Sequence, residues 1–231
     1  MGKVYKVLDT QDTGNCNWIA AAVDQATYDL IDVINLSLEV HDNDSTRVLC
    51  APLESAVNFA VGAGLLVVGI AGNVDFVGPN VGLPGAYANV LTVSGLKCGA
   101  TTSQGCSYDA VFWEGSASGP EVDLAAAAAG VAVSTPTTCS TLFGCTGGAV
   151  VYGDGTSYAA PLVSAVAAMV IAKYPDARRQ AQALAAHLKA TAYTPSSGAD
   201  SLRYGKGVLD AVKALATNPC LTQHCYLHPD P

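Results

Sequence analysis

Residues 155–161, Gly-Thr-Ser-Tyr-Ala-Ala-Pro, could place a nucleophile at the start of a helix. The glycine predicts a tight turn, and the apolar run 162–172 predicts the helix that follows it. Ser157 would then lie in the first helical turn, where backbone N–H groups lack an intrahelical acceptor and the dipole favours negative charge. A hydroxyl there could attack a carbonyl carbon, because free N–H donors would stabilise the resulting oxyanion. The alternative is an ordinary Ser/Thr cap of a buried helix.

Two earlier apolar segments end in polar residues that could complete such a site. Residues 32–38 read Asp-Val-Ile-Asn-Leu-Ser-Leu, and residues 67–73 read Val-Val-Gly-Ile-Ala-Gly-Asn. Both are suited to strands buried on both faces, and strands that alternate with helices predict a parallel α/β sheet. Ligands bind beyond the carboxyl ends of the strands in such sheets. We therefore expect Ser37, Gly72 and Asn73 to converge on one crevice.

These segments, in this order, resemble the subtilisin-like serine proteases (subtilases). Residues 155–161 are similar to the family's nucleophile motif, and residues 67–73 to the strand that ends in its oxyanion-hole asparagine. The resemblance covers about residues 4–216, and Tyr-Gly-Lys-Gly-Val-Leu-Asp at 204–210 matches the closing segment of the family. It implies a three-layer α/β/α fold with a mainly parallel sheet. It also implies peptide hydrolysis by acyl transfer through the serine.

The same resemblance assigns roles to individual side chains. Ser157 would be the nucleophile, and its backbone N–H would hold the oxyanion together with Asn73. The implied walls of the substrate pocket are small or apolar, which suggests an apolar substrate side chain: Ser37, Leu38, Ala71, Gly72 and Gly82. Glu39 stands where subtilases usually have glycine, so it would crowd the cleft or favour basic side chains. No cofactor is required; calcium sites are common in the family, but none can be placed on these loops.

Half of the expected catalytic machinery is absent from this sequence. The family's Asp-Ser/Thr-Gly and His-Gly-Thr-His motifs precede the segment matched by residues 4–8, and the sequence begins after them. Asp12 begins an Asp-Thr-Gly tripeptide, but its position predicts a polar turn. His41 follows Glu39 on a predicted exposed loop. The other histidines lie on a predicted helix and in the tail: His187, His224 and His228. We expect the chain alone to be inactive, because a serine hydroxyl needs a base and an orienting carboxylate.

The missing motifs have a structural consequence. In the family, the strand that ends in the catalytic Asp lies between the counterparts of residues 4–8 and 33–38. Without it these two strands must pair directly or leave an unfilled slot. We expect residues 1–217 to form an N-terminally incomplete peptidase domain without its first strands, including a central one, and residues 218–231 to form a polar Cys/His-containing tail.

Two other hypotheses remain open: a catalytically inactive subtilase-fold binding protein, and a truncated gene product. An α/β-hydrolase is disfavoured, because its Gly-x-Ser-x-Gly elbow would need glycine where Ala159 stands.

Bulk composition narrows the classes of partner. The net charge of −8 argues against a nucleic-acid binder, so polypeptide substrates are the expected partners. The longest apolar runs fall short of a membrane span, and no signal peptide is visible. We expect a monomer, with or without a further N-terminal segment.

The eight cysteines favour disulfides and a secreted protein. They sit in loops, and adjacent pairs suggest the bonds Cys98–Cys106, Cys139–Cys145 and Cys220–Cys225, leaving Cys16 and Cys50. These pairings are guesses, since eight cysteines allow 105 of them. A Cys/His metal cluster in the tail is the alternative, although its spacing fits no common zinc pattern well.

The remaining elements follow from local patterns. Strands are predicted at 4–8, 31–38, 65–70 and 90–93, polar or Gly/Pro-rich loops at 9–15, 41–47 and 74–88, and short strands and hairpins over 97–151. Helices are predicted around 18–26, from Pro52 to Gly62, and over 176–192 and 211–216. The alanine run 125–129 predicts tight packing beneath the Ser157 turn.

Overall fold

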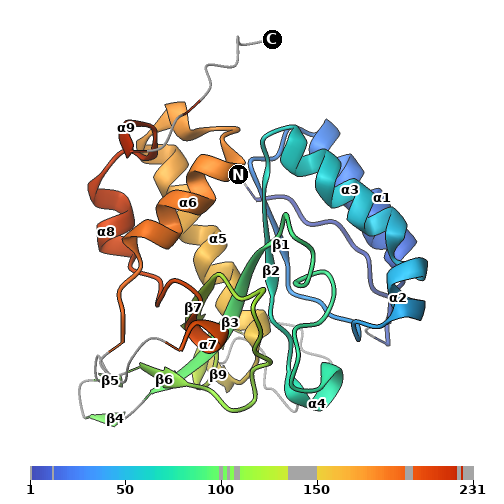
Figure 1. The fold of residues 1–231 in the computed structure, drawn as a ribbon, viewed down its shortest axis with the longest axis horizontal. Helices are drawn as coiled ribbons and strands as arrows, with labels where there is room; N and C mark the ends of the chain where they lie inside the picture. The colour runs from blue at the N-terminus through green and yellow to red at the C-terminus, as the bar shows by residue number, and fades with distance from the viewer. Residues whose placement is uncertain are drawn as a thin grey trace.

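The computed structural model describes residues 2–11, 13–98, 101–102, 105–106, 110–134, 150–195, 200–222 and 225. Figure 1 shows three layers: α1 (Cys16–Tyr28), α2 (Asp44–Leu49) and α3 (Ala51–Gly62) on one side of a central sheet, and α5 (Thr156–Lys173), α6 (Ala181–Thr191) and α8 (Ala211–Ala216) on the other. The predicted three-layer α/β/α fold is therefore confirmed.

The central sheet is mainly parallel. Its strands are β1 (Val33–Leu36), β2 (Leu66–Ile70), β3 (Leu91–Cys98), β6 (Ala110–Phe112) and β7 (Leu124–Ala127). β1 pairs with β2, β2 with β3, and β3 with β7, all in parallel, with the registers Ile34↔Val67, Gly69↔Thr92 and Val93↔Leu124. β6 adds to β3 in the antiparallel direction. The parallel strands place the ends of β1 and β2 at one edge, where the crevice was predicted.

Each face of the sheet carries its own apolar core. Buried side chains of β2, β3 and β7 pack against α5, and Val163, Ala167 and Val170 of that helix are fully buried. The opposite face packs against α1 and α3 through residues such as Val23 and Val57. Of the described helices, α5 is long and apolar enough to cross a membrane by length and composition. Here it is the central helix of one outer layer and packs on the sheet.

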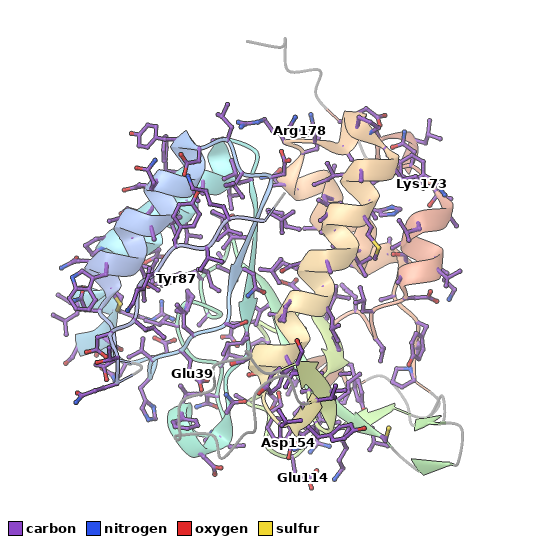
Figure 2. All side chains as sticks on the ribbon, turned by 180° about the vertical axis from the view of Figure 1, so that it is seen from behind. Glu39, Tyr87, Glu114, Asp154, Lys173 and Arg178 are labelled. Atoms are coloured by element: carbon purple, nitrogen blue, oxygen red, sulfur yellow. A yellow bond between two sulfur atoms is a disulfide. The ribbon has the colours of Figure 1, made fainter. Side chains whose placement is uncertain are left out.

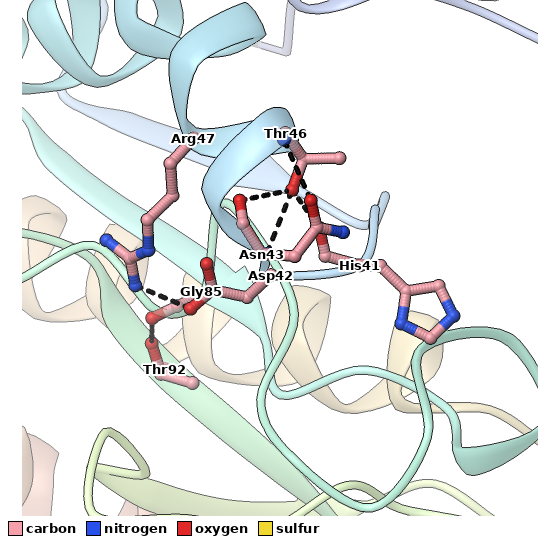
Figure 3. A network of polar contacts seen from close by, with 7 residues as sticks. All are labelled: His41, Asp42, Asn43, Thr46, Arg47, Gly85 and Thr92. Atoms are coloured by element: carbon pink, nitrogen blue, oxygen red, sulfur yellow. Dashed lines mark hydrogen bonds and ion pairs between the residues drawn. The ribbon is translucent and has the colours of Figure 1, made fainter.

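The helical layer beside β1 begins at well-formed caps. The Asn15 side chain accepts a hydrogen bond from the Trp18 N–H at the start of α1. Figure 3 shows the start of α2, where Asn43 and Thr46 form a capping box and Arg47 pairs with Asp42. Residues 41–47 were predicted to be a loop. That prediction was wrong for the second half, because the capping residues start a helix at Asp44.

Short elements connect the layers. Residues 74–88 are a loop as predicted, except that α4 (Val74–Val77) forms one helical turn after Asn73. The predicted helix 176–192 is a 3₁₀ turn (Pro175–Ala177) followed by α6. The hairpin region contains β4 (Thr101–Thr102), β5 (Gly105–Cys106), β8 (Val131–Ser134) and β9 (Val150–Gly153), and the last short helices are α7 (Ser201–Tyr204) and α9 (Pro219–Thr222).

The segment preceding α1 is not the strand that its sequence predicts. Residues 2–8 pair with no strand among the described residues, apart from an isolated bridge between Leu8 and Gly14, and Val4 is 92% exposed. A strand needs a hydrogen-bonding neighbour, and none is present here. Between residues 2–7 and β1 lies a cavity of about 430 Å³ lined by Ile19, Val23 and other apolar side chains. Of the two outcomes that the sequence allowed, the unfilled slot is the one observed.

Burial along β1 also differs from the prediction. Ile34 and Leu36 are buried, but Asn35 between them is exposed, so this strand is not buried on both faces. β2, by contrast, is buried along its whole length, as predicted.

Disulfides join Cys16 to Cys50 and Cys220 to Cys225. Cys98 is also disulfide-bonded. The first bond ties the start of α1 to the start of α3, within the layer beside β1. The predicted tail bond is confirmed, and it removes both tail thiols from the Cys/His metal alternative. Cys139 and Cys145 lie outside the described residues.

Candidate active site

The turn before α5 places Ser157 at the predicted position. Gly155 precedes the helix, and its N–H donates to the Ala128 carbonyl across 2.8 Å. Ala128 follows β7 and is fully buried. The alanine run thus packs beneath the turn, as predicted, because small side chains let the turn approach the strand. Ser157 is the second residue of α5, where helix geometry supplies no acceptor for its N–H.

Asn73 is fixed by the residue next to Ser157. Its Oδ1 accepts hydrogen bonds from the Thr156 N–H at 2.9 Å and from the Thr156 hydroxyl at 3.1 Å. Asn73 therefore caps α5 from a separate segment at the end of β2. Because Oδ1 faces a backbone N–H, which can only donate, the side-chain orientation is determined and Nδ2 faces the other way.

A second set of hydrogen bonds ties β1 to the start of α5. The Ser37 hydroxyl donates to the Ser157 carbonyl at 2.9 Å, and Asn35 Nδ2 donates to Ser37 Oγ at 2.9 Å. The Ser164 hydroxyl donates to Asn35 Oδ1 at 3.1 Å. The sequence interpretation did not assign Asn35, Thr156 or Ser164 to the site. Ser164 could have been predicted from its position in the helix, because it lies seven residues, or about two turns, after Ser157 on the same face.

A cavity of about 740 Å³ is lined by residues from the segment after β1, the segment after β2 and the start of α5. Ser37, Leu38, Glu39, Asn73 and Ser157 all lie on its wall, together with residues of the N-terminal turn, α1, α2 and α3. Among the described lining residues, Glu39 is the single ionisable side chain, since Cys16 and Cys50 form a disulfide. The described wall carries no histidine. The cavity is thus mainly apolar with one carboxylate beside the candidate nucleophile.

Glu39 is bound directly to Asn73. Its Oε1 accepts a hydrogen bond from Asn73 Nδ2 at 2.9 Å, and its Oε2 accepts one from the Asn73 backbone N–H at 2.7 Å. In Figure 2, Glu39 lies at the end of the molecule where β2 runs into α4. Burial raises the pKa of the Glu39 carboxyl, while the two hydrogen bonds from Asn73 act in the opposite direction.

Other predicted residues lie elsewhere. Ala71, Gly72 and Gly82 are buried behind the cavity and do not line it, so their place in a substrate pocket stays a prediction. His41 is exposed, as predicted. His187 is buried on α6, with Nε2 2.8 Å from the Ala214 carbonyl. Asp12, His224 and His228 lie outside the described residues. Within the described part of the chain, no three His, Cys, Asp or Glu residues form a cluster that could hold a metal ion.

Comparison with known proteins identifies the family. The family profile of the peptidase S8 group, the subtilases, matches residues 3–207. This chain belongs to the subtilase family. The subtilase chain is 33% identical to a thermostable alkaline protease of Halalkalibacterium halodurans; the alignment has 171 residues and covers 74% of this chain and 40% of that protein. It is 30% identical to subtilisin E of Bacillus subtilis; that alignment has 216 residues and covers 90% of this chain and 47% of subtilisin E.

Solved structures agree with the family assignment. A lanthipeptide protease superimposes with a TM-score of 0.72 at 25% identity, covering 91% of this subtilase chain and 68% of that structure. The chain spans about half the length of the curated relatives named above.

Proposed function

We propose that this subtilase chain carries the nucleophile and oxyanion half of a serine endopeptidase site. Ser157 attacks the peptide carbonyl, and the Ser157 N–H and Asn73 Nδ2 stabilise the oxyanion. The observation that carries the proposal is the Asn73–Thr156 pair of hydrogen bonds, because it holds the asparagine beside the first turn of α5. Ser37 and Leu38 would contact the substrate from the same cavity wall, with Ala71, Gly72 and Gly82 behind them.

We expect no measurable peptide hydrolysis by this chain alone. The described cavity wall offers no histidine to accept the Ser157 proton. Subtilisin without its triad retains only roughly 10³–10⁴-fold acceleration over water, from binding and the oxyanion hole. Polypeptides are the proposed substrates, with no metal or cofactor required. The disulfides support secretion.

One observation favours a second candidate, a subtilase-fold protein that binds peptides without cleaving them. Glu39 holds Asn73 Nδ2, the donor that the oxyanion would need. In such a binder the Ser157 hydroxyl would have no chemical role, and removing it would leave peptide affinity unchanged.

A peptidyl boronic acid with an apolar terminal side chain tests the proposal on this chain. Addition of Ser157 Oγ forms an O–B bond, releases the hydroxyl proton to buffer and converts trigonal boron to tetrahedral boron, which ¹¹B NMR detects. We expect a tetrahedral signal that Ser157→Ala abolishes and Ser55→Ala, on the exposed side of α3, leaves unchanged. Trigonal boron only, with equal binding by wild type and Ser157→Ala, would instead support the non-cleaving binder.

A further inference from the structure

The Glu39 carboxylate draws toward itself the Asn73 Nδ2 group, the side-chain donor that an oxyanion in this site would need, and accepts one of its two hydrogens. It accepts from the backbone N–H and from the side-chain Nδ2 of Asn73, at 2.7 and 2.9 Å. The opposite end of the same amide cannot substitute, because Oδ1 only accepts hydrogen bonds, and the two bonds that it accepts from Thr156 keep the amide in this orientation. A carboxylate and an oxyanion are both anions that accept hydrogen bonds from such donors. Glu39 is therefore a competitor for Asn73 that is built into the chain.

The backbone around Glu39 fixes this position. The next residue, Val40, exchanges two hydrogen bonds of 2.9 Å with Leu83, in an isolated antiparallel bridge. On the other side, Gly72 leaves the space that the carboxylate fills: a Cβ there would lie 2.7 Å from Glu39 Oε2. The contact with Asn73 is thus supported from two sides and is not a chance position of a long surface side chain.

No basic side chain on the described cavity wall neutralises this carboxylate. From the segment between β2 and α4 it faces Gly72 and Asn73, both neutral. The α1 and α3 sides of the cavity contribute the Cys16–Cys50 disulfide and uncharged residues, and α5 contributes Ser157. On its own segment, His41 attracts it electrostatically but is exposed to solvent. Protonation of Glu39 would therefore be the simplest way to remove its charge.

We propose that Glu39 is a self-inhibiting gate: ionised, it withholds Asn73 from the oxyanion, and neutralised by acid it releases Asn73. This inference rests on the proposed function of Ser157 and Asn73. Protonation leaves the Glu39–Asn73 contact without its charge assistance, so an incoming oxyanion can replace it. The same carboxylate would also repel the developing negative charge electrostatically while ionised. Acid would therefore open the site, and removing Glu39 would open it at every pH.

The dissociation constant of the peptidyl boronic acid, measured from pH 4 to pH 8, tests the gate. Glu39→Gln removes the charge, Glu39→Ala removes the occupant, and Glu121→Gln alters an exposed carboxylate elsewhere. We expect both Glu39 variants to bind at least about tenfold tighter than wild type at pH 7, since an oxyanion-hole donor is worth about 10²–10³ in rate. The difference should shrink on acidification, and Glu121→Gln should match wild type. Equal affinities of wild type and both Glu39 variants at every pH would overturn the gate.

A second measurement distinguishes failure of the Glu39 gate from failure of the proposed role of Ser157. The chemical shifts of the Asn73 side-chain amide in ¹H–¹⁵N NMR should change between pH 4 and pH 8 in wild type, because they report protonation of Glu39, and should stay constant in Glu39→Gln. If the amide titrates while no variant forms tetrahedral boron, the role of Ser157 fails but the hold of Glu39 on Asn73 stands. If tetrahedral boron forms equally in all variants and the amide does not titrate, the gate fails and the role of Ser157 stands.

Discussion

At the residue scale, Gly72 has no side chain, and this leaves room in the site for its neighbours Glu39 and Val77. Its φ of +111° lies in a region that other residues rarely adopt. A Cβ on this residue would lie 2.5 Å from Val77 Cγ2 and 2.7 Å from Glu39 Oε2. Both the backbone conformation and the space therefore require glycine here.

We expect Gly72→Ala to lower the free energy of unfolding by about 1–3 kcal/mol, through backbone strain and displaced neighbours. Urea denaturation measures this. Gly62→Ala, at the end of α3 with no atom within 4 Å of the new Cβ, is the matched control. It should be neutral or stabilising by about 0.5–1 kcal/mol. Equal effects of the two substitutions would contradict the argument.

Glu39 should also make stability depend on pH. Burial raises the pKa of its carboxyl above the ordinary value of 4.5, so the folded chain retains this proton to a higher pH than the unfolded chain does. The contribution of Glu39 to stability therefore falls as pH rises from 4.5 through the raised pKa. We expect the stability of Glu39→Gln relative to wild type, from urea midpoints, to increase between pH 4 and pH 7. A difference that stays constant over this range would refute the raised pKa.

At the element scale, the N-terminal segment is attached to the end of α1 by polar contacts. Asp29, which follows α1, accepts hydrogen bonds from Lys3, Tyr5 and Gln25. The bonds from Lys3 and Tyr5 lower the pKa of Asp29 to about 2. A lowered carboxyl pKa stabilises the attachment above the ordinary value of 3.8, and this contribution is lost as pH falls toward 2.

Asp29→Asn should loosen residues 2–8 without unfolding the sheet, because it removes the charge from the bonds that join Lys3 and Tyr5 to the end of α1 and leaves only the apolar packing of Tyr5 and Val7. Hydrogen–deuterium exchange should become faster in peptides from residues 2–8 and stay unchanged in β2. The control is Asp24→Asn on the same helix, which should match wild type. If Asp29→Asn leaves exchange in residues 2–8 as slow as in wild type, other contacts hold the segment.

Two disulfides, those with both partners in the described part of the chain, close segments of very different length. Cys16–Cys50 spans 34 residues, and Cys220–Cys225 spans 5. From loop-closure entropy, replacing the first pair by serine should cost about 4 kcal/mol and replacing the second about 2 kcal/mol. Urea unfolding of the two double variants measures both costs. A larger loss from the tail pair would show that chain entropy is not the main effect.

How well each element follows from the sequence depends on where its stabilising contacts come from. α3, β2, α5 and α8 follow from apolar patterns and turn residues in their own segments. The capping box of α2 is also local, but the polar composition of residues 41–47 predicted a loop there. Residues 2–8 carry a strand pattern without a strand, because pairing depends on a neighbour that no local pattern reveals. In the same way, Ser157 and Asn73 could be predicted from their motifs, whereas the Glu39–Asn73 contact joins segments 34 residues apart and needed the structure.

At the scale of the whole molecule, the fold positions a nucleophile and its anion donors while one edge of the sheet stays open. β1 is an edge strand among the described residues, and the cavity beside it is lined by Leu36 and Leu38, the neighbours of Ser37 in the sequence. Acyl transfer also needs a base within hydrogen-bond reach of Ser157. We therefore predict that Ser157 is correctly placed but reacts slowly unless a base is supplied.

Labelling with a fluorophosphonate, with and without added imidazole, tests this claim most directly. Ser157 Oγ bonds to phosphorus, fluoride leaves, and imidazole takes the hydroxyl proton, so peptide mass spectrometry can locate the adduct. We predict labelling at Ser157 that imidazole accelerates. In the Glu39→Gln background, where Asn73 is released, Asn73→Ala should slow this labelling by roughly 10²–10³. A folded sample that is not labelled at Ser157 under either condition, or a rate in that background that Asn73→Ala leaves unchanged, would contradict the proposed roles of Ser157 and Asn73.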